Sequence, residues 1–409
     1  MQTFIMLSWR NIWRHRRRSI VVISSIGLGI FGMLLSMAFT NSLGAQMIDN
    51  TISTSIGHIA VHAKGFQDNG KLELNFNPDK TIIKNIASVS SAYAPKIKIQ
   101  GMVRSSETAR GVMIIGIDPE REKTVSKIHE YTSSKDGSRY LNDPSENSIL
   151  ISKSMAKKLD LVIGDKLVLM LQDSKNEISG EGLVVKGVFE SPFETIDKFV
   201  VFVGIKKLQK ITGLGNNISE ITILLNDKNI VDPVKKSLVS GIGNPGLEIL
   251  TWKEMAPDVV NAVKLFDQMM YIFFMIIFVT VIFSVANILI MSIMERFHEI
   301  GVMKSIGTSP SRIFFMIMFE AFNLCLAGLA LGMIASVIFI GIMSVNGLDL
   351  SMFADSMRVY GSGSILYPYL KTMDIIISFM IILITAVTAA LYPAVKAARI
   401  KPLEALNFI

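Results

Sequence analysis

The chain has 409 residues, of which 50% are hydrophobic and only 18% are charged, and its mean hydropathy is +0.46. Soluble domains carry about a quarter charged residues, and the shortfall here is concentrated in four long stretches. This distribution excludes an ordinary cytosolic enzyme and a disordered chain. The net charge of +7 gathers near the start rather than over a folded face, which argues against nucleic-acid binding. The single cysteine, Cys325, excludes an intrachain disulfide and a cysteine-based zinc site.

Residues 1–17 combine apolar and basic side chains. Ile5, Trp9, Ile12 and Trp13 recur at helical spacing, and arginines fall on the other faces. The pattern predicts an amphipathic helix on the inner leaflet, with tryptophans at headgroup level. A basic flank without defined structure is the alternative.

Four apolar stretches predict membrane-spanning helices at residues 18–40, 266–294, 312–345 and 374–395. Each has about the 20 apolar residues that a span needs. Core helices of soluble proteins are amphipathic, whereas these are apolar all round. A cleaved signal peptide is an alternative for the first stretch, but its apolar run is too long for a usual signal core.

Basic residues beside the spans predict the topology. Arginines precede the first span without any acid among them, and Lys396, Arg399 and Lys401 follow the last. By the positive-inside rule, both termini, the segment 295–311 and the tail 396–409 are cytoplasmic. Residues 41–265 and the loop 346–373 are then extracytoplasmic.

The block 41–265 alternates short strand patterns with helix patterns, which indicates an α+β domain. A β-rich middle at about 121–219 separates two strand-helix-strand flanks and reads as an insertion. The predicted fold class is therefore an α-helical membrane protein with four transmembrane helices. A large α+β extracytoplasmic domain is inserted between helices 1 and 2.

Motifs of common catalytic sites are absent from the sequence. It has no GxxxxGK[ST], HExxH or GxSxG, and Pro245 makes the GxGxxG spacing at 241–246 a turn rather than a nucleotide loop. His58 and His62 share a strand face and could seed a metal site, although packing histidines are the simpler interpretation. We therefore expect no catalytic residues, no metal and no cofactor bound by this chain.

Three segments resemble FtsX-like ABC permeases. Residues 295–309, ERFHEIGVMKSIGTS, are similar to the family's R-x-x-E-I-G-V-x-[KR]-A-x-G-A-S segment. Residues 392–406 resemble its P-A-x-x-A-[AS]-x-[IL]-x-P-x-E-A-L tail, and residues 8–18 its A-W-R-N-[LI]-x-R-[NH]-[KR]-x-R leader. Gly57-His58-Ile59, Gly116-Ile117-Asp118-Pro119 and Gly164-Asp165 look similar to the lipoprotein-release branch, LolC and LolE.

The resemblance implies that residues 295–311 form a cytoplasmic coupling helix that docks on a separate ATPase. An apolar side of Ile300, Val302, Met303 and Ile306 would fit a groove, and an ordinary amphipathic loop helix is the alternative. The predicted coupling residues are Arg296, Phe297, His298, Glu299, Ile300, Gly301, Val302, Met303 and Lys304.

For three further sets of residues inside the spans, the sequence predicts an ion pair, helix packing and a cargo cavity. An acid within a span indicates function, and we predict a structural or coupling ion pair of Glu320 with Arg312 inside the membrane, with a proton relay as the alternative. Small residues four apart allow close helix packing, at Gly32 and Ser36 and at Gly328 and Gly332. Met33, Met37, Phe274 and Phe278 could line an apolar cavity for cargo, because methionine surfaces adapt to varied ligands; lipid-facing side chains are the alternative.

The resemblance implies a permease subunit of the bacterial inner membrane that is not itself an enzyme. Its expected partners are two copies of a cytosolic ATPase that binds ATP and Mg, a second permease (the same chain or a paralogue), membrane lipid, and a periplasmic carrier, adaptor or hydrolase. No nucleic acid is expected. Release or export of lipoprotein or other lipid-anchored or amphipathic cargo is the favoured function. An FtsX-like transmitter controlling a cell-wall hydrolase, a MacB-like efflux permease and an ATPase-independent receptor are the alternatives.

Overall fold

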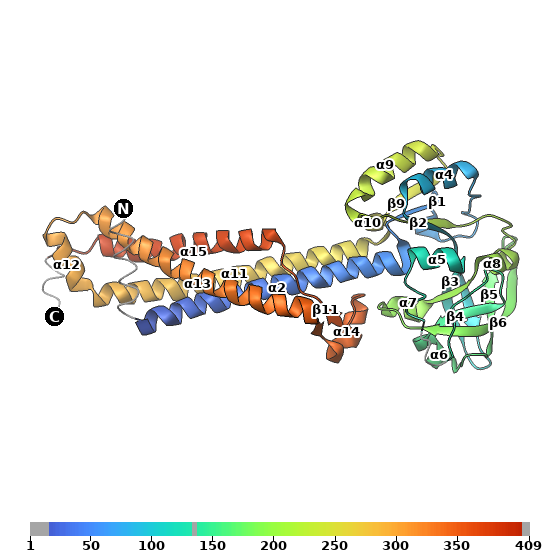
Figure 1. Ribbon diagram of the computed structural model, residues 1–409, viewed down its shortest axis with the longest axis horizontal. Coiled ribbons are helices and arrows are strands. Elements are labelled where there is room, and N and C mark those ends of the chain that lie inside the picture. Colours follow the sequence, from blue (N-terminus) through green and yellow to red (C-terminus); the bar gives the residue numbers. More distant parts are fainter. Residues whose placement is uncertain (1–15, 133–136, 403–409) are drawn as a thin grey trace. The chain divides into compact units, whose positions relative to one another are not determined.

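The computed structural model describes residues 16–132 and 137–402 and divides into two compact units (Figure 1). One unit is helical and comprises residues up to 44, 263–350 and from 365 onward. The other comprises residues 45–262 and 351–364. The amphipathic helix predicted at 1–17 lies almost wholly outside the described residues.

Four helices of the described chain are long and apolar enough to cross a membrane. They are α2 (Arg16–Thr51), α11 (Pro257–Glu295), α13 (Pro310–Asn346) and α15 (Thr372–Ala398). All four predicted spans fall within them. All four helices extend beyond the predicted limits, most of all α2, which continues past residue 40 to Thr51, and α11, which begins at Pro257. The apolar run marks what the membrane can cover, whereas a helix continues until a residue breaks its backbone hydrogen bonds.

Shorter elements join the long helices. Helix α12 (Phe297–Ser305) connects α11 to α13. After α13, the strands β10 (Leu348–Asp349) and β11 (Ile365–Leu366) pair antiparallel, with η3 (Ser351–Phe353) and α14 (Ala354–Val359) between them. The predicted loop 346–373 therefore contains a hairpin stem and a short helical segment.

Among the described residues of the second unit, nine strands form one sheet in the order β3-β7-β4-β6-β5-β2-β8-β1-β9. Their bounds are β1 (Ile59–Ala63), β2 (Ala92–Arg104), β3 (Ala109–Ile117), β4 (Ser148–Ser152), β5 (Lys166–Gln172), β6 (Ile178–Phe189), β7 (Val200–Gly204), β8 (Glu220–Leu224) and β9 (Leu247–Thr251). Helices cover this sheet: η1 (Ile52–Ile56), α3 (Phe66–Asn69), α4 (Lys80–Val89), α5 (Pro119–Val125), α6 (Lys153–Leu159), α7 (Glu194–Phe199), α8 (Ile205–Thr212), η2 (Lys228–Ile230), α9 (Val231–Ile242) and α10 (Trp252–Met255).

Strand β2 serves two parts of this sheet. Its first residues, Ala92–Lys96, pair with β8, and its last four, Gly101–Arg104, pair with β5. Because β2 also pairs with β3, the strands β2, β3, β7, β4, β6 and β5 close into a ring of pairings. The predicted boundary of the β-rich insertion at 121 is therefore wrong. The ring starts at β2, since a strand of 13 residues is long enough to pair with different neighbours at its two ends.

The core of this unit comes from alternating strand residues. Ile97, Ile99 and Val103 of β2 are buried, and their neighbours on β8 and β5 complete one apolar cluster. Helix starts are fixed by side-chain caps, as where Asp79 accepts a hydrogen bond from the Ile82 amide at 2.7 Å.

Candidate functional site

Helix α12 is short because residues at both ends break the helical path. Arg296 at its start leaves the α conformation, with φ −104° and ψ 19°. After its end, Gly307 takes φ +96°, which a residue with a side chain rarely adopts. Ser309 and Pro310 then begin α13, and proline suits a first helical position. The sequence therefore places a separate helix of nine residues, about two and a half turns, between two spans.

Arg296 joins this helix to α13 through an ion pair. Its Nη1 lies 3.4 Å from Oε2 of Glu320, and both residues are buried, at 9% and 5% exposure. Ser292 Oγ donates to Glu320 Oε1 at 3.4 Å, and Arg296 Nε contacts Glu299 Oε2 at 3.3 Å. A buried acid is thus neutralised by a cation from the preceding helix junction.

The predicted partner of Glu320 is therefore wrong. Arg312 is exposed and lies eight residues before Glu320 on the same helix, which is a rise of about 12 Å at about 1.5 Å per residue. The arginine that reaches Glu320 is instead one of the residues predicted for ATPase coupling. The intramembrane ion pair and the coupling segment are one cluster.

Lys304 joins α12 to the end of α15. Its Nζ donates hydrogen bonds to the carbonyl oxygens of Ala398 at 2.9 Å and Ile400 at 2.6 Å. The last carbonyls of a helix lack helical partners and carry partial negative charge, so an ammonium stabilises them. Helix α12 is therefore linked to α11 by the chain, to α13 by Arg296 and to α15 by Lys304.

The predicted coupling residues divide between two faces. Arg296, Ile300 and Gly301 are buried within the helical unit, and Phe297, Met303 and Lys304 are half-buried. The side chains of His298, Glu299 and Val302 are exposed, and Ile306 just beyond the helix is 78% exposed. The predicted apolar side is therefore split, because Ile300 packs inward while Val302 and Ile306 face outward. The exposed face combines apolar and charged groups, which suits docking to another protein.

One of the two predicted small-residue pairs packs helices together. A Cβ at Gly328 would lie 2.6 Å from Ile26, and one at Gly332 would lie 2.5 Å from the carbonyl oxygen of Gly27. This contact joins α13 to α2 within one chain. The other pair does not pack there, since a Cβ at Gly32 meets nothing within 4 Å and Ser36 is exposed. Gly32 and Ser36 lie on a different side of α2 from Gly27, so packing of this pair against a second chain stays a prediction.

The predicted cargo cavity is smaller and more polar than expected. Met37 and Phe274 line a cavity of about 140 Å³ at the outer end of the helical unit. Polar groups share its wall, including Asn41, which donates to Asp374 Oδ2 at 2.7 Å. The other predicted residues do not line it: Met33 is 1% exposed within the core and Phe278 is half-buried. The described residues of this chain therefore do not form an all-apolar chamber at this position.

In the second unit, Arg358 of α14 binds the end of β6 and helix α7. It donates to the carboxylate of Asp197, to Glu190 Oε1 at 3.2 Å and to the Ser191 carbonyl at 3.2 Å. Asp197 is 1% exposed. Burial raises the pKa of Asp197 above its usual value, against the opposing effects of Ser191 and Arg358. No motif in the sequence marks this cluster, and its one signal is a lone arginine in an acidic outside loop.

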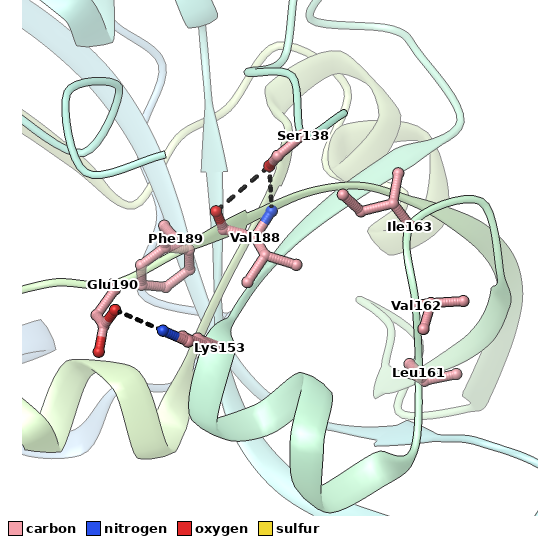
Figure 2. A pocket seen from close by; sticks show the side chains of 8 residues that line it. All are labelled: Ser138, Lys153, Leu161, Val162, Ile163, Val188, Phe189 and Glu190. Atoms are coloured by element: carbon pink, nitrogen blue, oxygen red, sulfur yellow. Dashed lines mark hydrogen bonds and ion pairs between the residues drawn. The ribbon is translucent and has the colours of Figure 1, made fainter. Parts of the chain in front are cut away.

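A cavity of about 470 Å³ lies beside this cluster, and Figure 2 shows the side chains that line it. Ser138 hydrogen-bonds both the amide and the carbonyl of Val188, and Lys153 pairs with Glu190 at 3.2 Å. Its lining is Ser138, Lys153, Leu161, Val162, Ile163, Val188, Phe189 and Glu190. The cavity could accept a small amphipathic group, with the ion pair at one side and aliphatic side chains at another.

The two histidines considered for a metal site make backbone contacts instead. His58 Nδ1 accepts from the Leu225 amide at 3.2 Å, and His62 Nδ1 lies 3.1 Å from the Ala63 carbonyl oxygen. Within residues 16–132 and 137–402, no three His, Cys, Asp or Glu side chains group as metal ligands. These backbone contacts support a packing role for both histidines.

Comparison with known families agrees with this architecture. Residues 271–402 match the FtsX-like permease C-terminal family, and residues 19–240 match the MacB-like periplasmic core domain. The second match spans more than half of the chain. The chain belongs to the family of FtsX-like permeases with a MacB-like periplasmic core domain, whose members are permease components of ABC transporters.

Relatives align over nearly the whole chain at low identity. A lipoprotein-releasing system transmembrane protein LolC of Xylella fastidiosa is 22% identical, covering 95% of this chain and 94% of its own. A lipoprotein-releasing system transmembrane protein LolE of Haemophilus influenzae is 20% identical over 100% of both chains. A macrolide export ATP-binding/permease protein MacB of Acinetobacter baylyi is 22% identical, covering 96% of this chain and 57% of its own. The extracytoplasmic domain between the first two spans is thus a family feature.

Proposed function

We propose that this chain is the permease subunit of an ABC transporter that drives release of lipoprotein, or of other lipid-anchored cargo, from the bacterial inner membrane. ATP and Mg²⁺ would bind to a separate ATPase, present in two copies. A second permease, either this chain or a paralogue, would complete the assembly. The observation that carries the proposal is the three-way attachment of α12. Both termini and α12 would then be cytoplasmic.

The attachment of α12 supplies a mechanical route from ATPase to membrane. An ATPase that binds the exposed face at His298, Glu299 and Val302 would push a helix that cannot move alone. Arg296 would transfer the displacement to α13 through Glu320, and Lys304 would transfer it to α15. Buried, hydrogen-bonded contacts suit this task because they resist sliding better than exposed pairs do.

The names of the relatives support lipoprotein as the proposed cargo. Proteins named for lipoprotein release align over 94–100% of their own length, whereas the MacB relative has a large part outside the match. The cavity beside Met37 and Phe274 is too small for a whole diacyl anchor, so cargo would be held between this chain and the second permease. That arrangement makes the second permease part of the cargo site.

The test is a mild-detergent purification of the tagged chain from native membranes, with and without trapped nucleotide, followed by identification of every bound protein. The proposal expects an ATPase together with a second permease. A periplasmic adaptor in its place would favour MacB-like efflux, and a wall hydrolase would favour FtsX-like signalling. Repeated preparations without any ATPase would overturn the proposal.

A paired variant locates the docking face. Val302→Asp places a charge on the exposed face of α12 and should abolish ATPase recovery while leaving the amount of chain in the membrane unchanged. Ile178→Asp is the matched control, because Ile178 is 78% exposed in the extracytoplasmic domain. Equal ATPase recovery with the two variants would exclude α12 as the docking face.

A further inference from the structure

The loop between α13 and α15 is held closed at its base. Leu348 pairs with Leu366 and Asp349 with Ile365, forming the short β10–β11 stem. This stem begins two residues after α13 and ends six residues before α15. The segment 351–360, η3 and α14, is the tip of the loop, and it belongs to the second unit.

The tip has a half-buried face and an exposed remainder. Ala354, Met357 and Arg358 are half-buried at helical spacing, and Arg358 fixes this face to Asp197 and Glu190. The exposed remainder of the tip carries four large apolar side chains together with the polar Ser351, Asp355 and Ser356. Met352 is 91% exposed, Phe353 55%, Val359 61% and Tyr360 45%. Met352 and Phe353 lie just before α14, and Val359 and Tyr360 lie at its end.

The chain keeps these apolar side chains near the membrane. Helix α13 is apolar up to Val345, which is 79% exposed, and Met352 follows Asn346 by six residues. A chain extends at most about 3.5 Å per residue, so Met352 lies within about 20 Å of the end of that span. On the return path, Tyr367 and Tyr369 are 50% and 40% exposed and precede α15 by a few residues. Tyrosines at such positions are typical of the membrane interface.

We propose that Met352, Phe353, Val359 and Tyr360 insert into the outer-leaflet interface of the bilayer. The segment would act as an interfacial anchor, with Arg358 tying it to the extracytoplasmic domain. The occupant is a phospholipid surface, because the segment is tethered by a paired stem to the ends of two spans. Its side chains are those that favour the boundary between headgroups and acyl chains. This assignment does not depend on the cargo or on an ATPase.

The test uses the full chain in nanodiscs of phosphatidylethanolamine and phosphatidylglycerol. Cys325 is replaced by alanine, and a single cysteine at Met352→Cys carries an NBD fluorophore. Doxyl-labelled lipids should quench this probe several-fold, and its emission should be shifted to the blue. The control is Ile178→Cys, at a position 78% exposed on the β5–β6 hairpin, whose probe should keep an aqueous spectrum and resist quenching.

Two results would overturn the assignment. A water-like spectrum at position 352 equal to that at 178 would mean that the apolar side chains are not covered. A blue shift without quenching by doxyl lipids would mean that protein, not lipid, covers them. A second probe at Val359→Cys keeps the test decisive if the first variant misfolds, because Val359 is a second exposed apolar side chain of the same tip, at its other end.

Discussion

The Arg296 guanidinium and the Glu320 carboxylate lie 3.4 Å apart and join the start of α12 to α13. Both groups are almost fully buried, and Ser292 also donates a hydrogen bond to the acid. Their proximity means that a residue of the segment predicted to couple to an ATPase neutralises the acid inside a predicted span. Displacement of α12 cannot occur without moving or breaking this pair.

Removing one member of this pair should be more harmful than removing both. Arg296→Gln removes the cation that lies 3.4 Å from Glu320, and Glu320→Gln leaves Arg296 beside Glu299 but without the buried acid, and breaking a buried pair in this way typically costs about 3–5 kcal/mol. The double variant should lose less than the sum of the two. The free energy of unfolding in mixed micelles measures this, with Arg312→Gln as the exposed control. Additive losses in the double variant would contradict the pairing.

Lys304→Met should loosen the end of α15 without unfolding the helical unit. The substitution removes hydrogen bonds to the carbonyls of Ala398 and Ile400 and the charge that favours a helix C-terminus. A charged hydrogen bond is worth about 1.5–3 kcal/mol, so amide exchange around residues 398–402 should rise by about 10-fold or more. Lys396→Met tests whether any lysine near this end has the same effect. If amide exchange is unchanged in Lys304→Met, Lys304 does not hold α12 against the end of α15.

Gly332→Ala and Gly32→Ala should have opposite effects although both lie in small-residue motifs. A Cβ at Gly332 would lie 2.5 Å from the Gly27 carbonyl, and overpacking of this kind costs about 1–3 kcal/mol. A Cβ at Gly32 meets nothing, and alanine favours helix by about 1 kcal/mol relative to glycine. Melting temperatures in one detergent compare the two. Equal destabilisation by the two substitutions would mean that α2 and α13 do not pack together through Gly332.

The sequence predicted what depends on local pattern. Four apolar runs predicted the four long helices, because membrane helices must be apolar over about 20 consecutive residues. Residues far apart in the chain were harder to pair. Glu320 was matched to Arg312 because both lie in one stretch, whereas the true partner comes from the preceding helix junction. Similarly, the double pairing of β2 with β5 and β8 depends on strands that lie dozens of residues away.

The extracytoplasmic cluster illustrates a second limit. Arg358 and Asp197 carry no motif, and neither residue type is unusual in an outside segment. Only the fold brings α14 against α7. Small-residue pairs show the same limit, because Gly32 and Gly328 have similar sequence surroundings but only Gly328 faces another helix of the chain.

Glu220→Gln should change the acid stability of the extracytoplasmic domain. The Glu220 carboxylate is buried and contacts Lys98 Nζ at 2.7 and 2.8 Å. Burial acts to raise its pKa, but Lys98 and Lys96 together hold that pKa below its usual value of 4.5. An acid with a lowered folded pKa stabilises the fold above its unfolded pKa, and this stabilisation is lost as pH falls through the folded pKa.

The variant should therefore lose stability less steeply than the parent as pH is lowered below about 5, the region where acids with ordinary pKa values begin to bind protons. Amide exchange of β8 in the full chain, followed as a function of pH, measures this. Glu120→Gln is the matched control, since its side chain is 73% exposed beside Lys123. Identical pH slopes in the parent and Glu220→Gln would show that this carboxylate does not set acid stability.

Arg358→Gln should release α14 from the extracytoplasmic domain. The substitution leaves the Asp197 carboxylate, which is 1% exposed, without its cation. Arg358 is itself 27% exposed, so we expect a loss of about 1.5–3 kcal/mol, as for hydrogen bonds to charged groups. Amide exchange in residues 351–364 should then accelerate by about 10- to 100-fold. Lys153→Gln, at a lysine that is 71% exposed beside Glu190, should leave it unchanged. Because Asp197→Asn removes the orphaned charge, it should partly restore slow exchange in the Arg358→Gln background; failure to do so would mean that another contact holds α14 in place.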